Sequence, residues 1–269
     1  MFDTKPTHND FHSSLRSWRK IRKLSQLELA LNADVSQRHI SWLETGRSQP
    51  SREMIVRLSD AMDVPLRDRN HLLNAAGFTN IYSEKTLDEP SMAPISNILS
   101  EMLKHHEPYP AYVLDRHWNI KMKNSAADVL FEMTENDPEA IWQAVGDDGN
   151  HNLALLSIHP NGLRQFITNW DEFISLFMRR LRKEAMESND ETIMQAYQGL
   201  AEYAGDMPEE NFNDPLLPVI SLDMNLGGIP LSLCSVISTF GTAQDITTDE
   251  LRIETFYPAN EATARFFKE

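Results

Sequence analysis

The chain has 269 residues, of which 41% are hydrophobic, and a formal net charge of −15. This length exceeds one average domain of roughly 100 to 200 residues, so we expect two domains. The sequence has no run of 18 apolar residues and no charged-then-apolar leader, so we expect neither a membrane span nor a secretory signal. The single cysteine, Cys234, cannot form an internal disulfide, which favours a cytoplasmic protein.

Charge is distributed unevenly along the chain. Residues 1–80 contain 12 Lys and Arg against 9 Asp and Glu, a net of +3, whereas residues 81–269 contain 13 against 31, a net of −18. Between them, residues 79–94 hold two prolines and three acidic residues without a periodic apolar pattern, as is typical of a linker. We therefore predict a domain at 1–80, a linker at 81–94 and a domain of different function at 95–269.

The first domain is expected to be all-helical. Apolar residues recur at steps of three and four, and Ser25-Gln26-Leu27-Glu28 has the pattern of a capping box, which satisfies free backbone amides at a helix start. The predicted helices cover about residues 11–23, 25–32, 36–45, 51–62 and 66–76. The second and third of these are short and joined by a turn of three or four residues, which is the helix-turn-helix geometry.

The third predicted helix has a polar outer face that suits DNA. Gln37 and Arg38 lie at the end that enters the major groove, where arginine can fork onto guanine and glutamine onto adenine. Gln26 is placed to hold a phosphate, with Thr45 and Arg47 on the other side. The predicted DNA contacts are Gln26, Ser36, Gln37, Arg38, His39, Ser41, Trp42, Thr45 and Arg47. A solvated polar face on an ordinary helical bundle is the alternative.

The second domain is predicted to be an antiparallel sheet covered by helices, which makes the whole chain an α+β multidomain protein. A helix at 91–107 is followed by a strand at 112–114, a turn, a strand at 118–122 and a helix from Asn124. Residues 163–205 are helical with a broad apolar face. Three strands follow at 219–225, 229–241 and 251–258, the first two joined by a Gly227-Gly228 hairpin turn.

Several segments resemble known families. "SQLELALNADVSQRHISWLETGRSQPS" resembles the xenobiotic-response-element group of lambda-repressor-like helix-turn-helix domains. "HEPYPAYVLDRHWNIKMKNSAA", "HPNGLRQFITNW" and "LRIETFYPANEAT" resemble the MmyB-like ligand-binding domain of bacterial regulators. The first resemblance implies that Arg19 pairs with Glu44, and Lys23 departs from it because such domains usually have glycine there. The second implies a PAS-like pocket for an apolar small molecule, such as a fatty acid.

Candidate ligand contacts in the second domain are aromatic residues and two polar anchors for a carboxylate. They are Trp118, Phe131, His159, Arg164, Phe166 and Trp170. The alternative is that the aromatic residues fill an ordinary core, while His159 and Arg164 cap a helix or lie in solvent. Apolar pockets with a few polar anchors are where small effectors bind.

Catalysis receives little support, because motifs such as HExxH, GxSxG and GxxxxGK are missing from the sequence. The acidic segment at 146–151, GDDGNH, offers Asp147, Asp148, Asn150 and His151 to a metal but lacks EF-hand spacing. A solvated loop is the plainer interpretation. We predict no enzyme, no metal, and no certain cofactor beyond a possible bound fatty acid.

The sequence therefore favours a cytoplasmic transcription regulator that binds double-stranded DNA at a pseudo-palindromic operator, as a homodimer, without a membrane partner. Its second domain would sense a small apolar effector. Two alternatives stay open: a DNA-binding protein whose second half only dimerises or docks a protein, and a metal-dependent enzyme with a helix-turn-helix appended.

Overall fold

The computed structural model describes residues 10–134, 138–147, 149–188, 190–205 and 221–268. The chain divides into two compact units. The first unit contains residues up to Lys85 together with 186–189 and 243–249, and the second contains 86–185, 190–242 and 250–269. Each unit is described by itself.

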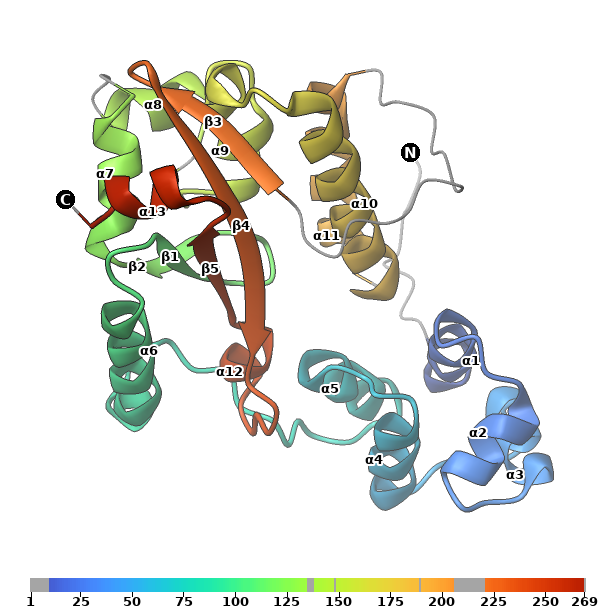
Figure 1. Ribbon diagram of the computed structural model, residues 1–269. Helices are drawn as coiled ribbons and strands as arrows, with labels where there is room; N and C mark the ends of the chain where they lie inside the picture. The colour runs from blue at the N-terminus through green and yellow to red at the C-terminus, as the bar shows by residue number, and fades with distance from the viewer. Residues whose placement is uncertain (1–9, 135–137, 148, 189, 206–220, 269) are drawn as a thin grey trace, which may run out of the picture. The chain divides into compact units, whose positions relative to one another are not determined.

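Five helices form the first unit in the predicted order (Figure 1): α1 (Phe11–Ile21), α2 (Gln26–Asn32), α3 (Gln37–Glu44), α4 (Arg52–Ala61) and α5 (Leu66–Ala75). Serine side chains cap three of them. Ser25 and Glu28 form the predicted capping box of α2. Ser36 accepts from the His39 amide at the start of α3, and Ser51 accepts from the Met54 amide at the start of α4. The all-helical prediction is confirmed.

One apolar core holds these helices together. Leu15, Trp18, Ile40 and Leu43 are each exposed by 1% or less and join α1 to α3. Their spacing is the three-and-four periodicity of the sequence, which aligns apolar side chains on one helix face. The polar residues Gln37 and Arg38 of α3 consequently lie on its outer side, whereas Glu44 at the end of the helix is buried.

The second unit contains a five-stranded sheet with strand order β2-β1-β5-β4-β3 and antiparallel neighbours throughout. The strands are β1 (Ala111–Leu114), β2 (Ile120–Lys123), β3 (Ser221–Leu226), β4 (Ile229–Thr239) and β5 (Arg252–Pro258). The predicted sheet is confirmed, including the hairpin at Gly227 and Gly228, both of which have positive φ. Residues 219 and 220 of the predicted third strand lie outside the described residues.

Helices accompany this sheet on both faces. They are η1 (Pro90–Met92), α6 (Ala93–His105), α7 (Ser125–Glu132), α8 (Pro138–Ala144), α9 (Leu153–Ile158), η2 (Leu163–Phe166), α10 (Trp170–Ser188), α11 (Glu191–Ala204) and α13 (Glu261–Phe266). A further helix, α12 (Ile246–Glu250), lies mostly in the segment 243–249 that belongs to the first unit. The helix predicted over 163–205 is interrupted. Asp190 caps a separate α11 by accepting from the Thr192 amide, and η2 is a 3₁₀ turn.

Alternation along β1 separates two apolar clusters. Ala111 and Val113 face α6, where Leu99 and Leu103 cover them. Tyr112 and Leu114 face the larger cluster formed with α7 to α10. Successive strand residues point to opposite faces, so both faces of β1 are buried. Among the described helices, none has the length and apolarity needed to cross a bilayer.

Candidate functional site

The C-terminal end of α3 is held in place by the buried carboxylate of Glu44. Glu44 is 3% exposed and accepts hydrogen bonds from Arg19 Nε at 2.5 Å and Nη2 at 3.1 Å, and from Gln26 Nε2 at 2.8 Å. Burial raises the pKa of Glu44, but the Arg19 and Gln26 hydrogen bonds and the Arg19 charge outweigh it, so the net pKa is lowered. The Arg19–Glu44 pair that the family resemblance implied is therefore present.

Two further side chains of α1 hold the end of α3, and sequence reasoning missed both. His12 Nδ1 lies 2.6 Å from the Leu43 carbonyl oxygen, and Arg16 Nη2 donates to the Glu44 carbonyl oxygen at 2.8 Å. These bonds satisfy carbonyls that a helix end leaves without intrahelical partners. Contacts between residues about 30 positions apart leave no local pattern, so no sequence signal would have shown them.

The opposite end of α3 projects into solvent. Ser36, Gln37 and Arg38 are exposed, and the Arg38 guanidinium lies 4.4 Å from the centre of the Trp42 ring, one helical turn away. Stacking uses the face of the guanidinium and leaves its N–H edge available for hydrogen bonds. The structure thus presents an exposed glutamine and an arginine held beside Trp42 at the same end of α3.

The other predicted DNA residues lie along α3, at and beyond its C-terminal end, and at the start of α2. Arg47 is exposed, while His39 and Ser41 are half-buried. The Thr45 hydroxyl donates to the Ser41 carbonyl at 2.7 Å, which leaves its oxygen able to accept. The Gln26 side chain donates one amide N–H to Glu44, so a phosphate at the start of α2 would meet the Gln26 backbone N–H or the second N–H of its side-chain amide.

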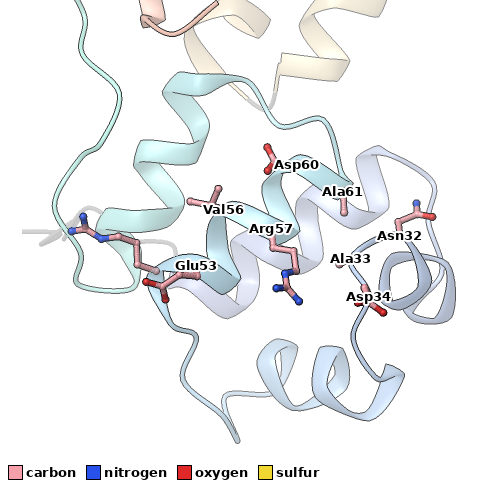
Figure 2. A pocket seen from close by; sticks show the side chains of 9 residues that line it. Asn32, Ala33, Asp34, Glu53, Val56, Arg57, Asp60 and Ala61 are labelled. Atoms are coloured by element: carbon pink, nitrogen blue, oxygen red, sulfur yellow. The ribbon is translucent and has the colours of Figure 1, made fainter. Parts of the chain in front are cut away.

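A shallow groove of about 700 Å³ lies elsewhere on the first unit, between the turn after α2 and one side of α4 (Figure 2). It is lined by Asn32, Ala33, Asp34, Arg52, Glu53, Val56, Arg57, Asp60 and Ala61. Its charged side chains are of both signs, and the predicted DNA contacts do not line it. It therefore does not belong to the tip of α3.

The second unit encloses a small cavity against the sheet. Its volume is about 50 Å³, and aromatic and aliphatic side chains form most of its wall. The lining residues are Tyr112, Trp118, Leu130, Leu153, Ser157, Leu163, Phe173, Phe177, Arg180, Leu222, Met224, Ser235, Glu254 and Phe256. A largely apolar wall with a few polar groups is typical of small-molecule sites.

The charged groups of this cavity belong to an organised network. Glu254 is 5% exposed and its Oε1 accepts from the Ser235 hydroxyl at 2.7 Å. Glu184 accepts from Trp118 Nε1 at 3.1 Å, Arg180 Nε at 3.1 Å and Arg252 Nη1 at 2.5 Å. Arg180 also lies over the Trp118 ring, 4.9 Å from its centre. These contacts fix the Arg180 guanidinium at the cavity wall.

Of the six predicted ligand residues, Trp118 lines the cavity and the other five lie elsewhere. Phe131 is buried beside Trp142, and Phe166 packs half-buried against the same core. Arg164 donates to the Tyr203 carbonyl at 2.7 Å and stacks on Trp170, while the His159 ring lies 4.5 Å from the Tyr203 ring.

Arg180 and Glu254 were not among the sequence candidates. The only available signal was the alternation in β5, where Glu254 shares a face with Phe256. That signal is ambiguous because Ile253 and Tyr257 make the other face look equally apolar.

The acidic loop at 146–151 has a structural explanation. Asp147 accepts from the backbone amides of Gly149, His151 and Asn152 at 2.8 to 3.0 Å. Its carboxylate oxygens thus stabilise the loop. Asp148 lies outside the described residues, and the part of the chain that is described contains no cluster of acidic, histidine or cysteine residues able to hold a metal.

Family models match a segment in each of the two units. Residues 15–68 match the helix-turn-helix family, and residues 95–269 match the family described as MmyB-like transcription regulator ligand binding domain. No curated protein matches the chain. The chain therefore belongs to the MmyB-like family of transcription regulators, and it is a DNA-binding regulator with a domain for a small-molecule effector.

Proposed function

We propose that the tip of α3 reads base edges in the major groove of an operator. The observation that carries this proposal is the pairing of exposed Gln37 with Arg38, whose guanidinium is stacked on Trp42. Ser36, His39, Ser41 and Trp42 flank these two readers along the same helix. Gln26, Thr45 and Arg47 contact phosphates and set the register.

Residues 1–80 form the DNA-binding domain in this proposal, 81–94 the linker and 95–269 the effector-binding and dimerisation domain. A homodimer in the cytoplasm would place two heads on half-sites roughly 34 Å apart, so its operator would be pseudo-palindromic. The acidic character of residues 81–269 repels phosphates, which leaves DNA contact to the heads.

Selection of bound sequences from random DNA tests this proposal with the full chain. Enrichment of a two-fold symmetric site supports it, together with a shallow dependence of log affinity on log salt, because few phosphates are contacted. Failure to enrich any sequence, or the steep salt dependence of a protein basic over its whole surface, would refute it.

The effector in this proposal is a small apolar molecule, with a fatty acid as the specific candidate, bound in the cavity beside Trp118 in a PAS-like domain. The apolar wall with its arginine and carboxyl group supports the assignment. A cavity of about 50 Å³ has room for only a few water molecules. An acyl chain would therefore have to displace buried lining residues such as Met224 and Phe173.

The small volume of the cavity also favours a second candidate, in which the second domain only dimerises or docks a protein. Thermal denaturation across a panel of fatty acids separates the two functions. A ligand that binds the folded protein raises its midpoint with concentration. The absence of any shift across the panel, with no small molecule seen in native mass spectrometry, would favour the second candidate.

A further inference from the structure

The polar end of the cavity carries an acid where an apolar pocket would ordinarily hold none. Glu254 is 5% exposed, lines the cavity, and has one carboxyl oxygen, Oε1, engaged by the Ser235 hydroxyl. Burying an ionised carboxylate in apolar surroundings is unfavourable unless it is fully paired. The group therefore has a reason to remain protonated, and a protonated carboxyl donates a hydrogen bond.

Charged and titratable groups reach Glu254 from several elements. Arg180 and Glu184 come from α10, Arg252 from β5 and Tyr112 from β1, with Asp128 of α7 close to Tyr112. Burial raises the pKa of Glu254 and Glu184 acts in the same direction. Ser235, Arg180 and Arg252 oppose them without reversing the shift. Because the pKa of Glu254 is raised on balance, its carboxyl group stays neutral over a wider pH range.

Three side chains can donate hydrogen bonds at this end of the cavity. Arg180 presents a guanidinium oriented by Trp118 and Glu184, and Tyr112 presents a phenol that burial holds in its neutral form, since its pKa is raised. Neutral Glu254 adds a carboxylic O–H. A group that only accepts hydrogen bonds and carries negative charge complements this set.

We propose that Arg180 and protonated Glu254 together bind the carboxylate head of the effector, so that binding of an acyl carboxylate is linked to a proton on Glu254. This inference rests on the proposed effector cavity and specifies which of its residues select the head group. Ionised Glu254 repels the ligand carboxylate, so affinity falls as pH rises through the pKa of Glu254.

Three ligands of equal chain length test the proposal by calorimetry on the full chain: sodium octanoate, 1-octanol and octylamine, each at pH 6, 7 and 8. Octanoate stays ionised and octylamine stays protonated over this range, so a change in affinity reports on the protein. We expect octanoate to bind most tightly and, above the pKa of Glu254, to lose up to tenfold in affinity per pH unit.

Three variants test whether Glu254 and Arg180 recognise the octanoate carboxylate or only support the fold. Glu254→Gln keeps the size and an N–H donor but cannot titrate, so octanoate binding should become independent of pH. Arg180→Met should weaken octanoate more than octanol. Glu261→Gln, whose side chain is 89% exposed, is the matched control and should leave the wild-type pH profile unchanged.

Three results would overturn the inference. Tightest binding of octylamine would make Glu254 an ionised acceptor, and pH-independent octanoate binding by the wild type would remove the proton linkage. Binding of none of the three would reject the cavity as the effector site as well, while DNA selection would still decide the proposed operator recognition independently.

Discussion

Replacing Glu44 should destabilise the packing of α3 far more than the substitution of an exposed residue would. Glu44→Ala removes three hydrogen bonds from Arg19 and Gln26 and leaves the Arg19 guanidinium, whose side chain is 13% exposed, without its carboxylate. Breaking a buried pair in this way costs about 3 to 5 kcal/mol. We expect a value near the lower end, about 3 kcal/mol, because Arg19 is partly exposed and retains a bond to the Leu24 carbonyl.

Hydrogen exchange of the full chain, followed by mass spectrometry of its peptides, can measure this loss of stability segment by segment. A change of about 3 kcal/mol in the opening free energy accelerates exchange roughly 100- to 200-fold, and the effect should concentrate in peptides from residues 11–45. The double variant Arg19→Ala/Glu44→Ala should lose less than the sum of the two single variants, since no buried charge is then left alone. Glu261→Ala, in an exposed pair, should change little. Less than tenfold acceleration in Glu44→Ala, or additive single effects, would show that the pair does not hold α3 in place.

Other consequences concern pH, backbone strain and the segment after α5. Because the pKa of Glu44 is lowered from its ordinary value of 4.5, its contribution to stability should be present above that value and disappear as pH falls through the folded-state pKa, so exchange in wild type and Glu44→Gln should converge in acid. Lys23 has φ of 54°, so Lys23→Gly should be more stable than Lys23→Ala by about 1 kcal/mol in thermal or urea unfolding, and equal stabilities would argue against strain there. Asn70, 4% exposed, bonds the backbone of Ile81 and Tyr82 at three points. Asn70→Ala should therefore speed proteolytic cleavage near residue 81, and an unchanged rate would contradict that role.

Local patterns predicted the first unit well because three of its helices begin at a serine cap and their apolar residues follow the helical period. Ser25, Ser36 and Ser51 cap helices where the sequence indicated, and apolar spacing identified Ile40 and Leu43 as core. The pairing of Arg19 with Glu44 came from family resemblance and not from spacing.

The second unit was less predictable because some of its helices are short and its decisive contacts are distant in sequence. α9, for example, has six residues, too few for a helical period to be recognised. The cavity wall joins Trp118 in the turn between β1 and β2, Arg180 on α10 and Glu254 on β5. An acid in a strand is ordinarily solvent-facing, and Glu254 is buried because helices that are distant in sequence, α10 among them, pack over this face of the sheet.

Binding of the Arg38→Ala variant to the selected operator and to random duplex DNA tests base reading most directly. We expect a loss of about 1 to 3 kcal/mol on the operator, roughly 5- to 150-fold in affinity, with little change on random DNA. Arg47→Ala, as the matched phosphate contact, should weaken both duplexes alike. Equal weakening of both duplexes by Arg38→Ala, or no effect on either, would contradict the assignment of the α3 tip as the reader of sequence.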